Sequence, residues 1–197
     1  MCIRDRAMHV SPSLIGPEQR KVLDVAMKRA QDKVIPEAWK MWSNLTDRHY
    51  PLFIETMYVD DADYILVTMG AYSKDVEYVV KKLRRKKVKI GSIRLRYFRP
   101  FPTEELRKAV ECVKAVGVVD FSFSLGSPDH GSTLFNEIKS ALYNAGNRPI
   151  LMDFIFSGGR ETTITELEKV AGLLMEAVKV GKAEKPVRWL TVRGEDI

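Results

Sequence analysis

Two loops of this chain carry the residues best suited to hold an anion. Arg99 stands before Pro100, which keeps its backbone extended, and a guanidinium there can bind a carboxylate or a phosphate through two parallel hydrogen bonds. Gly158 and Gly159 allow a sharp turn that exposes backbone amides ahead of a helix, and Arg160 can complete an anion site there. These positions are therefore candidate anion-binding or interface loops.

Each of these signals also has a simpler interpretation. Arg99 can form an internal ion pair with Asp120 or Glu104 that holds the turn. Arg160 can lie in a tight turn and contact a neighbouring subunit. His130 stands in a third loop, but a lone histidine without a positioned partner is more often a surface residue than a general base. Local sequence leaves these alternatives open.

Motifs of an independent catalytic centre are absent from the sequence. It has no dinucleotide fingerprint, no phosphate-binding P-loop and no nucleophile-elbow motif. The three histidines are scattered without the spacing of metal ligands. The two cysteines cannot supply the four thiolates that an iron–sulfur cluster usually needs. We therefore assign no catalytic, cofactor-binding or metal-binding residue.

Strands and helices alternate around these loops. Apolar runs predict five strands, at residues 52–58, 64–69, 89–97, 116–119 and 150–156. Ser73 and Thr103 are expected to cap helices, and Thr163 with Glu166 predicts a capping box. Residues 186–192 are expected to form an edge strand or an arm. Because parallel strands need helical crossovers of one hand, this pattern predicts a three-layer α/β/α sandwich, with the strand order left open.

The region before the first strand is predicted to be helical. An amphipathic helix is expected from Pro17, which suits a first helical position. Pro36 is expected to interrupt it before a second helix through Trp39 and Trp42. We expect the two tryptophans in core packing or a subunit contact rather than in ligand stacking.

Length and charge narrow the class of protein. The chain has 197 residues, enough for one good-sized core, and a net charge of +6. A basic cluster at residues 81–87 lies at the end of a predicted helix, where it favours the helix dipole. It lacks interleaved aromatic residues, so nucleic-acid binding is not expected, whereas an acidic protein remains a candidate partner. Without an apolar run of membrane-spanning length or a secretory signal, and with two cysteines, we expect no membrane association and a cytoplasmic location.

Four motifs in combination are similar to one known family. They are residues 55–70 with the turn Asp61-Ala62-Asp63, Arg99-Pro100-Phe101-Pro102, residues 131–143 and Gly158-Gly159-Arg160. Over residues 22–173 the chain resembles the second domain of the alpha subunit of 2-oxoacid:ferredoxin oxidoreductases, of which pyruvate:ferredoxin oxidoreductase (pyruvate synthase) is one. Phe156-Ser157 and Glu161 depart from the family pattern, which leaves the particular 2-oxoacid open.

This resemblance implies a fold of the transketolase C-terminal type. Its sheet has five mostly parallel strands in the order 1-3-2-4-5, and the antiparallel first strand lies beside residues 89–97. It also implies a crevice between residues 70–73 and 120–131, where the crossovers diverge. The chain is then divided into an unassigned or vestigial segment (1–16), a helical linker (17–50), the transketolase C-terminal-like domain (51–181) and a tail (182–197).

The resemblance further implies a function. The family converts 2-oxoacids to acyl-coenzyme A with thiamine diphosphate, and [4Fe-4S] clusters carry the electrons to ferredoxin. No catalytic residue of the family carries over, because other domains build the thiamine site. We therefore expect a non-catalytic scaffold domain of a truncated alpha subunit that binds no cofactor itself. Its expected partners are the thiamine-binding beta, the gamma and the ferredoxin-like delta subunits, and indirectly ferredoxin. A stand-alone small-anion or nucleotide-binding α/β module is the alternative.

Overall fold

The computed structural model describes residues 12–156 and 162–192, and the chain divides into two compact units. Met1–Leu52 is the helical unit, and Phe53–Ile197 is the sheet unit. Among the described residues no helix is both long and apolar enough to cross a membrane.

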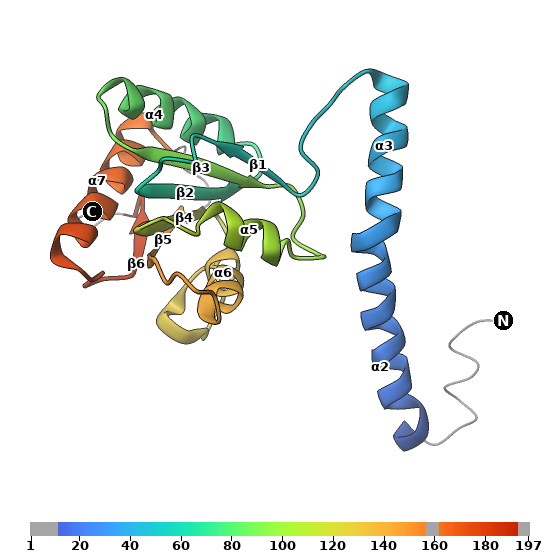
Figure 1. Cartoon of the computed structure of the whole chain (residues 1–197). Helices are drawn as coiled ribbons and strands as arrows, with labels where there is room; N and C mark the ends of the chain where they lie inside the picture. The colour runs from blue at the N-terminus through green and yellow to red at the C-terminus, as the bar shows by residue number, and fades with distance from the viewer. Residues whose placement is uncertain (1–11, 157–161, 193–197) are drawn as a thin grey trace. The chain divides into compact units, whose positions relative to one another are not determined.

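One long helical segment makes up most of the helical unit (Figure 1). It consists of α2 (Pro12–Arg29), the π-helical turn η1 (Ala30–Val34) and α3 (Ile35–Thr46). The start predicted at Pro17 is wrong: Pro17 lies inside α2, because its φ suits a helix and it forfeits only one backbone hydrogen bond. The interruption predicted at Pro36 is also wrong. Immediately before it, the wider turn of η1 lets Ile35 N donate to Ala30 O, and the helix continues.

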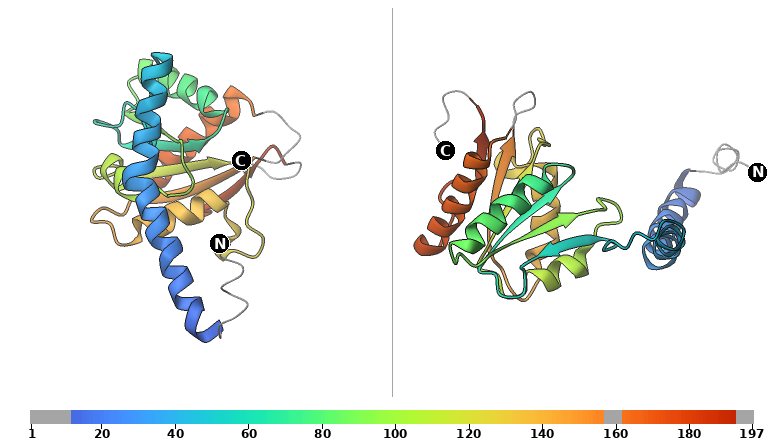
Figure 2. Two further views of the ribbon diagram at one scale, coloured as in Figure 1. Left: turned by 90° about the vertical axis from the view of Figure 1, so that its right-hand side faces the viewer. Right: turned by 90° about the horizontal axis from the view of Figure 1, so that it is seen from above.

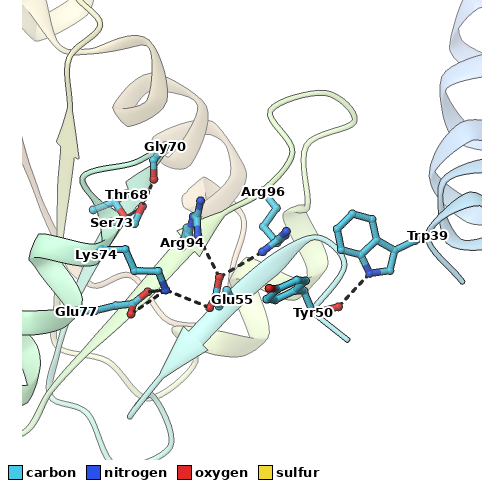
Figure 3. Close-up of polar contacts among 10 residues, drawn as sticks. All are labelled: Trp39, Tyr50, Glu55, Thr68, Gly70, Ser73, Lys74, Glu77, Arg94 and Arg96. Carbon is cyan, nitrogen blue, oxygen red and sulfur yellow. Dashed lines mark hydrogen bonds and ion pairs between the residues drawn. The ribbon is translucent and has the colours of Figure 1, made fainter. Parts of the chain in front are cut away.

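The two tryptophans of α3 pack against each other. The ring centroids of Trp39 and Trp42 lie 5.2 Å apart in a stacked arrangement, and Tyr50 lies 6.1 Å from Trp42. Trp39 Nε1 donates a hydrogen bond to Tyr50 O at 3.0 Å (Figure 3). The tryptophans therefore tie the segment after α3 back onto the helix.

A mixed sheet of six strands organises the sheet unit. The strands are β1 (Ile54–Met57), β2 (Tyr64–Met69), β3 (Ile90–Leu95), β4 (Ala115–Asp120), β5 (Ile150–Phe156) and β6 (Val187–Leu190). Their order is β1-β3-β2-β4-β5-β6, with β1 antiparallel to β3 and every other pair parallel. The predicted order and the antiparallel first strand are confirmed. The prediction of five strands is one short, because residues 187–190 extend the sheet beside β5.

Helices cover both faces of the sheet, which confirms the three-layer α/β/α sandwich (Figures 1 and 2). The helices are α4 (Ser73–Arg85), α5 (Thr103–Ala109), the 3₁₀ turn η2 (Pro128–His130), α6 (Thr133–Tyr143) and α7 (Ile164–Val180). One core cluster joins α4 and α7 to the sheet, and the second joins α5 and α6 to the opposite face. Buried Leu66 enters the first cluster, whereas its neighbours Ile65 and Val67 enter the second. The continuous apolar run of β2 therefore serves both layers.

A glycine in β4 sets how closely α7 approaches the sheet. A Cβ added to Gly117 would stand 2.8 Å from Leu174 Cδ1 and 3.1 Å from Leu66 Cδ2. Any larger residue would therefore push the helix away or distort the strand.

The helix caps only partly match the predictions. The capping box of Thr163 and Glu166 is present at α7. Thr103 is the first residue of α5 rather than its cap, since Pro102 occupies the N-cap position without a side-chain hydrogen bond. Ser73 likewise opens α4 instead of capping it, because its Oγ donates to Gly70 O.

Candidate functional site

The crevice expected for a ligand lies at the carboxyl ends of β2 and β4. These neighbouring strands lead into α4 and α6 on opposite faces, which makes their ends the topological switch point. Tyr72 lies across this place: its Oη donates to Val119 O at 2.9 Å, and its ring packs edge-on against Phe121 with centroids 4.7 Å apart. Burial, and after it the nearby Asp120, raises the pKa of the Tyr72 phenol well above its usual range. A neutral side chain therefore fills the expected crevice.

Two carboxylates beside this crevice cap α6. Asp153 is fully buried in β5, where its Oδ2 accepts from Ser132 N at 2.5 Å and its Oδ1 from Ser132 Oγ at 2.9 Å. Asp120 Oδ2 accepts from Ser122 Oγ and, at 3.3 Å, from Leu134 N. Burial raises the pKa of Asp153 to about 6, although the hydrogen bonds from Ser132 act against this. Both carboxylates satisfy the first N–H groups of a helix, which is a structural task.

Arg99 makes an ion pair, but with neither predicted partner. Its Nη2 lies 2.6 Å from Glu137 Oε1 on α6, and its guanidinium stands 4.3 Å from the centre of the Phe98 ring. An internal ion pair therefore forms, but the predicted partners Asp120 and Glu104 are wrong, because Asp120 is used to cap α6 and Glu104 pairs with Arg107. About half of the Arg99 side chain stays exposed, so it remains accessible to a partner.

The other predicted site residues lie in two further loops. His130 is exposed at the end of η2 and shares no hydrogen bond or ion pair with Arg99 in the described part of the chain. In the same turn Asp129 pairs with Lys139 at 2.6 Å, which ties the loop to α6. Gly158, Gly159 and Arg160 lie outside the described residues.

A polar cavity that sequence reasoning missed lies between the sheet and α4. It measures about 90 Å³, and its wall consists of Glu55, Thr56, Met57, Thr68, Ser73, Glu77, Ser92 and Arg94. The strand register explains this gathering. Arg94 on β3 is paired with Glu55 on β1 and with Thr68 on β2, so their side chains share the face that α4 covers.

Three of the lining residues, Glu55, Glu77 and Arg94, belong to a charge network at one side of this cavity (Figure 3). Glu55 faces three cations, with Oε2 at 3.3 Å from Arg96 Nη1 and 3.5 Å from Arg94 Nη1, and Oε1 at 3.8 Å from Lys74 Nζ. Lys74 also donates to both oxygens of Glu77, at 2.8 and 3.0 Å.

Two buried hydroxyls close another side of the cavity. Thr68 Oγ1 donates to Ser73 Oγ, and Ser73 Oγ donates to Gly70 O, each at 2.8 Å. The signal in the sequence was the polar residues within apolar strands. Only the register between strands could show that they meet.

The donor sets for metals and cofactors are poor. Among the described residues no group of three or more His, Cys, Asp or Glu side chains could hold a metal ion. Cys112 is the one described cysteine, and it is an exposed free thiol. One described thiol does not suit an iron–sulfur cluster, which needs several thiolates together.

Comparison with known proteins gives a consistent family. The family model for "Pyruvate:ferredoxin oxidoreductase core domain II" matches residues 62–167. Ketoisovalerate oxidoreductase subunit VorA of Pyrococcus horikoshii is 39% identical over 158 residues, which are 80% of this chain and 39% of that protein. Pyruvate synthase subunit PorA of Pyrococcus abyssi is 34% identical over 179 residues, which are 90% of this chain and 44% of that protein.

Among solved structures, a 2-oxoglutarate:ferredoxin oxidoreductase from Magnetococcus marinus aligns with a TM-score of 0.48 and 16% identity. The alignment covers 68% of this chain and 21% of that one. The chain thus spans about two fifths of the length of the curated relatives named above.

Proposed function

Because the chain belongs to the pyruvate:ferredoxin oxidoreductase core domain II family, we propose that it is a non-catalytic scaffold and interface domain of a thiamine-diphosphate-dependent 2-oxoacid:ferredoxin oxidoreductase. The observation that supports this proposal is the family match, which runs from two residues before β2 into α7. The whole enzyme would convert pyruvate or a related 2-oxoacid to an acyl-coenzyme A and reduce ferredoxin. The similarity to both a ketoisovalerate and a pyruvate enzyme leaves two substrate candidates.

The proposal places thiamine diphosphate outside this domain. The switch point is where an open α/β sheet would receive such a ligand, and the Tyr72 side chain lies across it with its ring packed against Phe121. In the complete complex thiamine diphosphate supplies the carbanion chemistry, and [4Fe-4S] clusters carry electrons. The contribution of this chain is then to hold and orient the parts that bind them.

The expected partners are the beta, gamma and delta subunits, with ferredoxin reached indirectly. Support comes from the helical unit, whose single long helix has no second helix or strand to pack against within the described residues of that unit. Residues 17–50 would then be a linker between domains, 51–181 the scaffold domain and 182–197 a tail. Arg99 and the Gly158–Arg160 loop would contact neighbouring subunits, in a complex located in the cytoplasm.

A domain exchange tests the proposal. In a pyruvate synthase subunit of known activity, the segment aligned with residues 62–167 is replaced by the segment from this chain. We expect the exchanged subunit to assemble and to reduce viologen, with the parent's ratio of rates on pyruvate and ketoisovalerate. A ratio shifted toward the other 2-oxoacid in a fully assembled complex would show that this domain contacts the substrate, against the proposal.

One observation bears on the alternative function. A nucleotide-binding module is not supported, because the aromatic side chains occupy the crevice that it would use.

A further inference from the structure

We propose that the long helix of the helical unit pairs with the same helix of a second copy of this chain, antiparallel to it and related by a two-fold axis at Val34. The contact surface is one apolar stripe along α2, η1 and α3. The proposal goes beyond the scaffold function and does not rest on it, because it concerns a contact between two identical chains.

An exposed apolar stripe follows one side of this helix. Its residues recur at steps of 4, 3, 4, 4, 3 and 4, close to the 3.6 residues of a helical turn. They are Leu23, Met27, Ala30, Val34, Ala38, Met41 and Leu45. The large side chains among them are 46% to 84% exposed. Soluble proteins rarely expose a long contiguous apolar surface unless it binds a partner, so we expect the stripe to be covered.

The stripe reads the same in both directions from Val34. The matching pairs are Leu23 with Leu45, Met27 with Met41, and Ala30 with Ala38, which lie 11, 7 and 4 positions from Val34 on either side. In an antiparallel pair with its two-fold axis at Val34, every side chain of the stripe therefore meets its own type in the second copy. A two-fold interface between identical chains requires such self-complementarity. An unrelated partner would require no such symmetry, which is why we choose a second copy.

Charged residues beside the stripe favour the antiparallel orientation. Arg29, Lys33 and Glu37 follow one flank of it, all are exposed, and none has an ion pair within the described part of the chain. Antiparallel helices place equal flanks together, so Glu37 of one copy comes to lie between Arg29 and Lys33 of the other. In a parallel pair Glu37 would instead face the opposite flank, where Trp42 lies. The opposed helix dipoles also favour the antiparallel pair.

The extent of the contact predicts a reversible dimer. From Leu23 to Leu45 the helix rises about 33 Å. Two copies bring together ten large apolar side chains, and burial of roughly 100 Å² by each gives roughly 1,000 Å² in total. Specific interfaces begin at about this area, so we expect half of the chains to be dimeric at roughly micromolar concentration.

The test is the mass of the full 197-residue chain, measured by sedimentation equilibrium over a range of concentrations. The mass should rise from the 22.5 kDa of one chain to twice that value. A mass that stays at one chain up to about a hundredfold above the expected midpoint would overturn the proposal.

Two variants with the same substitution separate the stripe from the rest of the helix. Val34→Asp places two like charges face to face at the two-fold axis and should weaken dimerisation about tenfold or more. Val25→Asp is the control: Val25 is 57% exposed, close to the 50% of Val34, and it lies on the far side of the helix, two positions from both Leu23 and Met27. It should leave dimerisation unchanged. Equal weakening by both variants, or none by Val34→Asp, would contradict the assignment.

Charge reversal keeps the test independent of any loss of helix in Val34→Asp. Glu37→Lys should weaken dimerisation severalfold, and its combination with Arg29→Glu and Lys33→Glu should restore it. Failure of the triple variant to restore the dimer would refute the pairing of these flanks.

Disulfide cross-linking tests the orientation. With Cys2→Ser and Cys112→Ser as background, Leu23→Cys and Leu45→Cys chains are oxidised separately and as a mixture. We expect cross-linked dimers chiefly in the mixture, because Leu23 of one copy lies opposite Leu45 of the other. Cross-linking of Leu23→Cys with itself as efficient as in the mixture would show a parallel pair and overturn the proposal.

Discussion

Asp153 offers the sharpest test of how the carboxyl edge of the sheet is held together. Asp153→Ala leaves both Ser132 N and Ser132 Oγ without their buried acceptor. An unsatisfied buried donor costs about 1–3 kcal/mol, so this variant should lose about 2–5 kcal/mol of unfolding free energy. Asp153→Asn keeps an oxygen for Ser132 N and nearly the same volume. In acid, where the aspartate is neutral too, it should cost about 1 kcal/mol or less.

The difference in unfolding free energy between Asp153→Asn and the unaltered chain should depend on pH, because the pKa of Asp153 is raised. Burial raises the pKa of Asp153 from 3.8 to about 6, so the native state binds its proton more tightly than the unfolded state does. The stability that this proton provides is fully present below about pH 4 and is lost as the pH rises through about 6. A shift of about two pKa units corresponds to about 3 kcal/mol. Because asparagine does not titrate, Asp153→Asn should gain up to about 3 kcal/mol relative to the unaltered chain between about pH 4 and pH 7.

Urea denaturation of the unaltered chain and of Asp153→Asn at several pH values in this range measures this difference in unfolding free energy. The difference between the two chains cancels the contribution of every other titrating group. A difference that stays constant with pH, or that favours the aspartate as the pH rises, would refute the argument. So would equal destabilisation by the alanine and asparagine variants.

Three further changes test other parts of the molecule. Val67→Asp places an unpaired charge at a fully buried position of the central strand β2 and should cost more than about 4 kcal/mol, so circular dichroism should show no native thermal transition. Lys87→Gly should raise the melting temperature and stabilise the fold by up to about 1 kcal/mol, since Lys87 has a left-handed φ of 63° after α4; a lower melting temperature would contradict this. Arg99→Gln breaks an ion pair between partly exposed side chains and should change stability by less than about 1 kcal/mol. If Arg99 contacts another subunit, gel filtration of the complex should nevertheless show weaker assembly, and unchanged assembly would assign it to the internal ion pair alone.

The strands were predictable where a continuous apolar run marked them in the sequence. The bounds of β2 and β5 agree with the predicted residues 64–69 and 150–156, because continuous apolar runs mark strands buried on both faces. Strand order came from the family resemblance, since hydrophobic periodicity carries no information about neighbours. The short β6 is half-buried and only four residues long, so its pattern could not separate a strand from an arm.

The sites were less predictable, because they depend on contacts between distant segments. Arg99 reaches Glu137, 38 positions away, and nothing in the local sequence distinguishes this carboxylate from Asp120 or Glu104. The cavity beneath α4 needs the register of three strands and the first turns of a helix at once. Tyr72 follows the same rule: the family resemblance implied that residues 70–73 form one wall of a crevice, but only the fold shows that the Tyr72 ring lies across it.

The central claim, that the chemistry of the complex resides outside this domain, is tested most directly on the purified chain by itself. The 197-residue protein is supplied with thiamine diphosphate, magnesium, coenzyme A and pyruvate or ketoisovalerate, and viologen reduction is followed. We predict no reduction above the rate without protein, and by calorimetry no thiamine diphosphate binding tighter than about millimolar. Sustained turnover that disappears on omission of thiamine diphosphate would contradict the account.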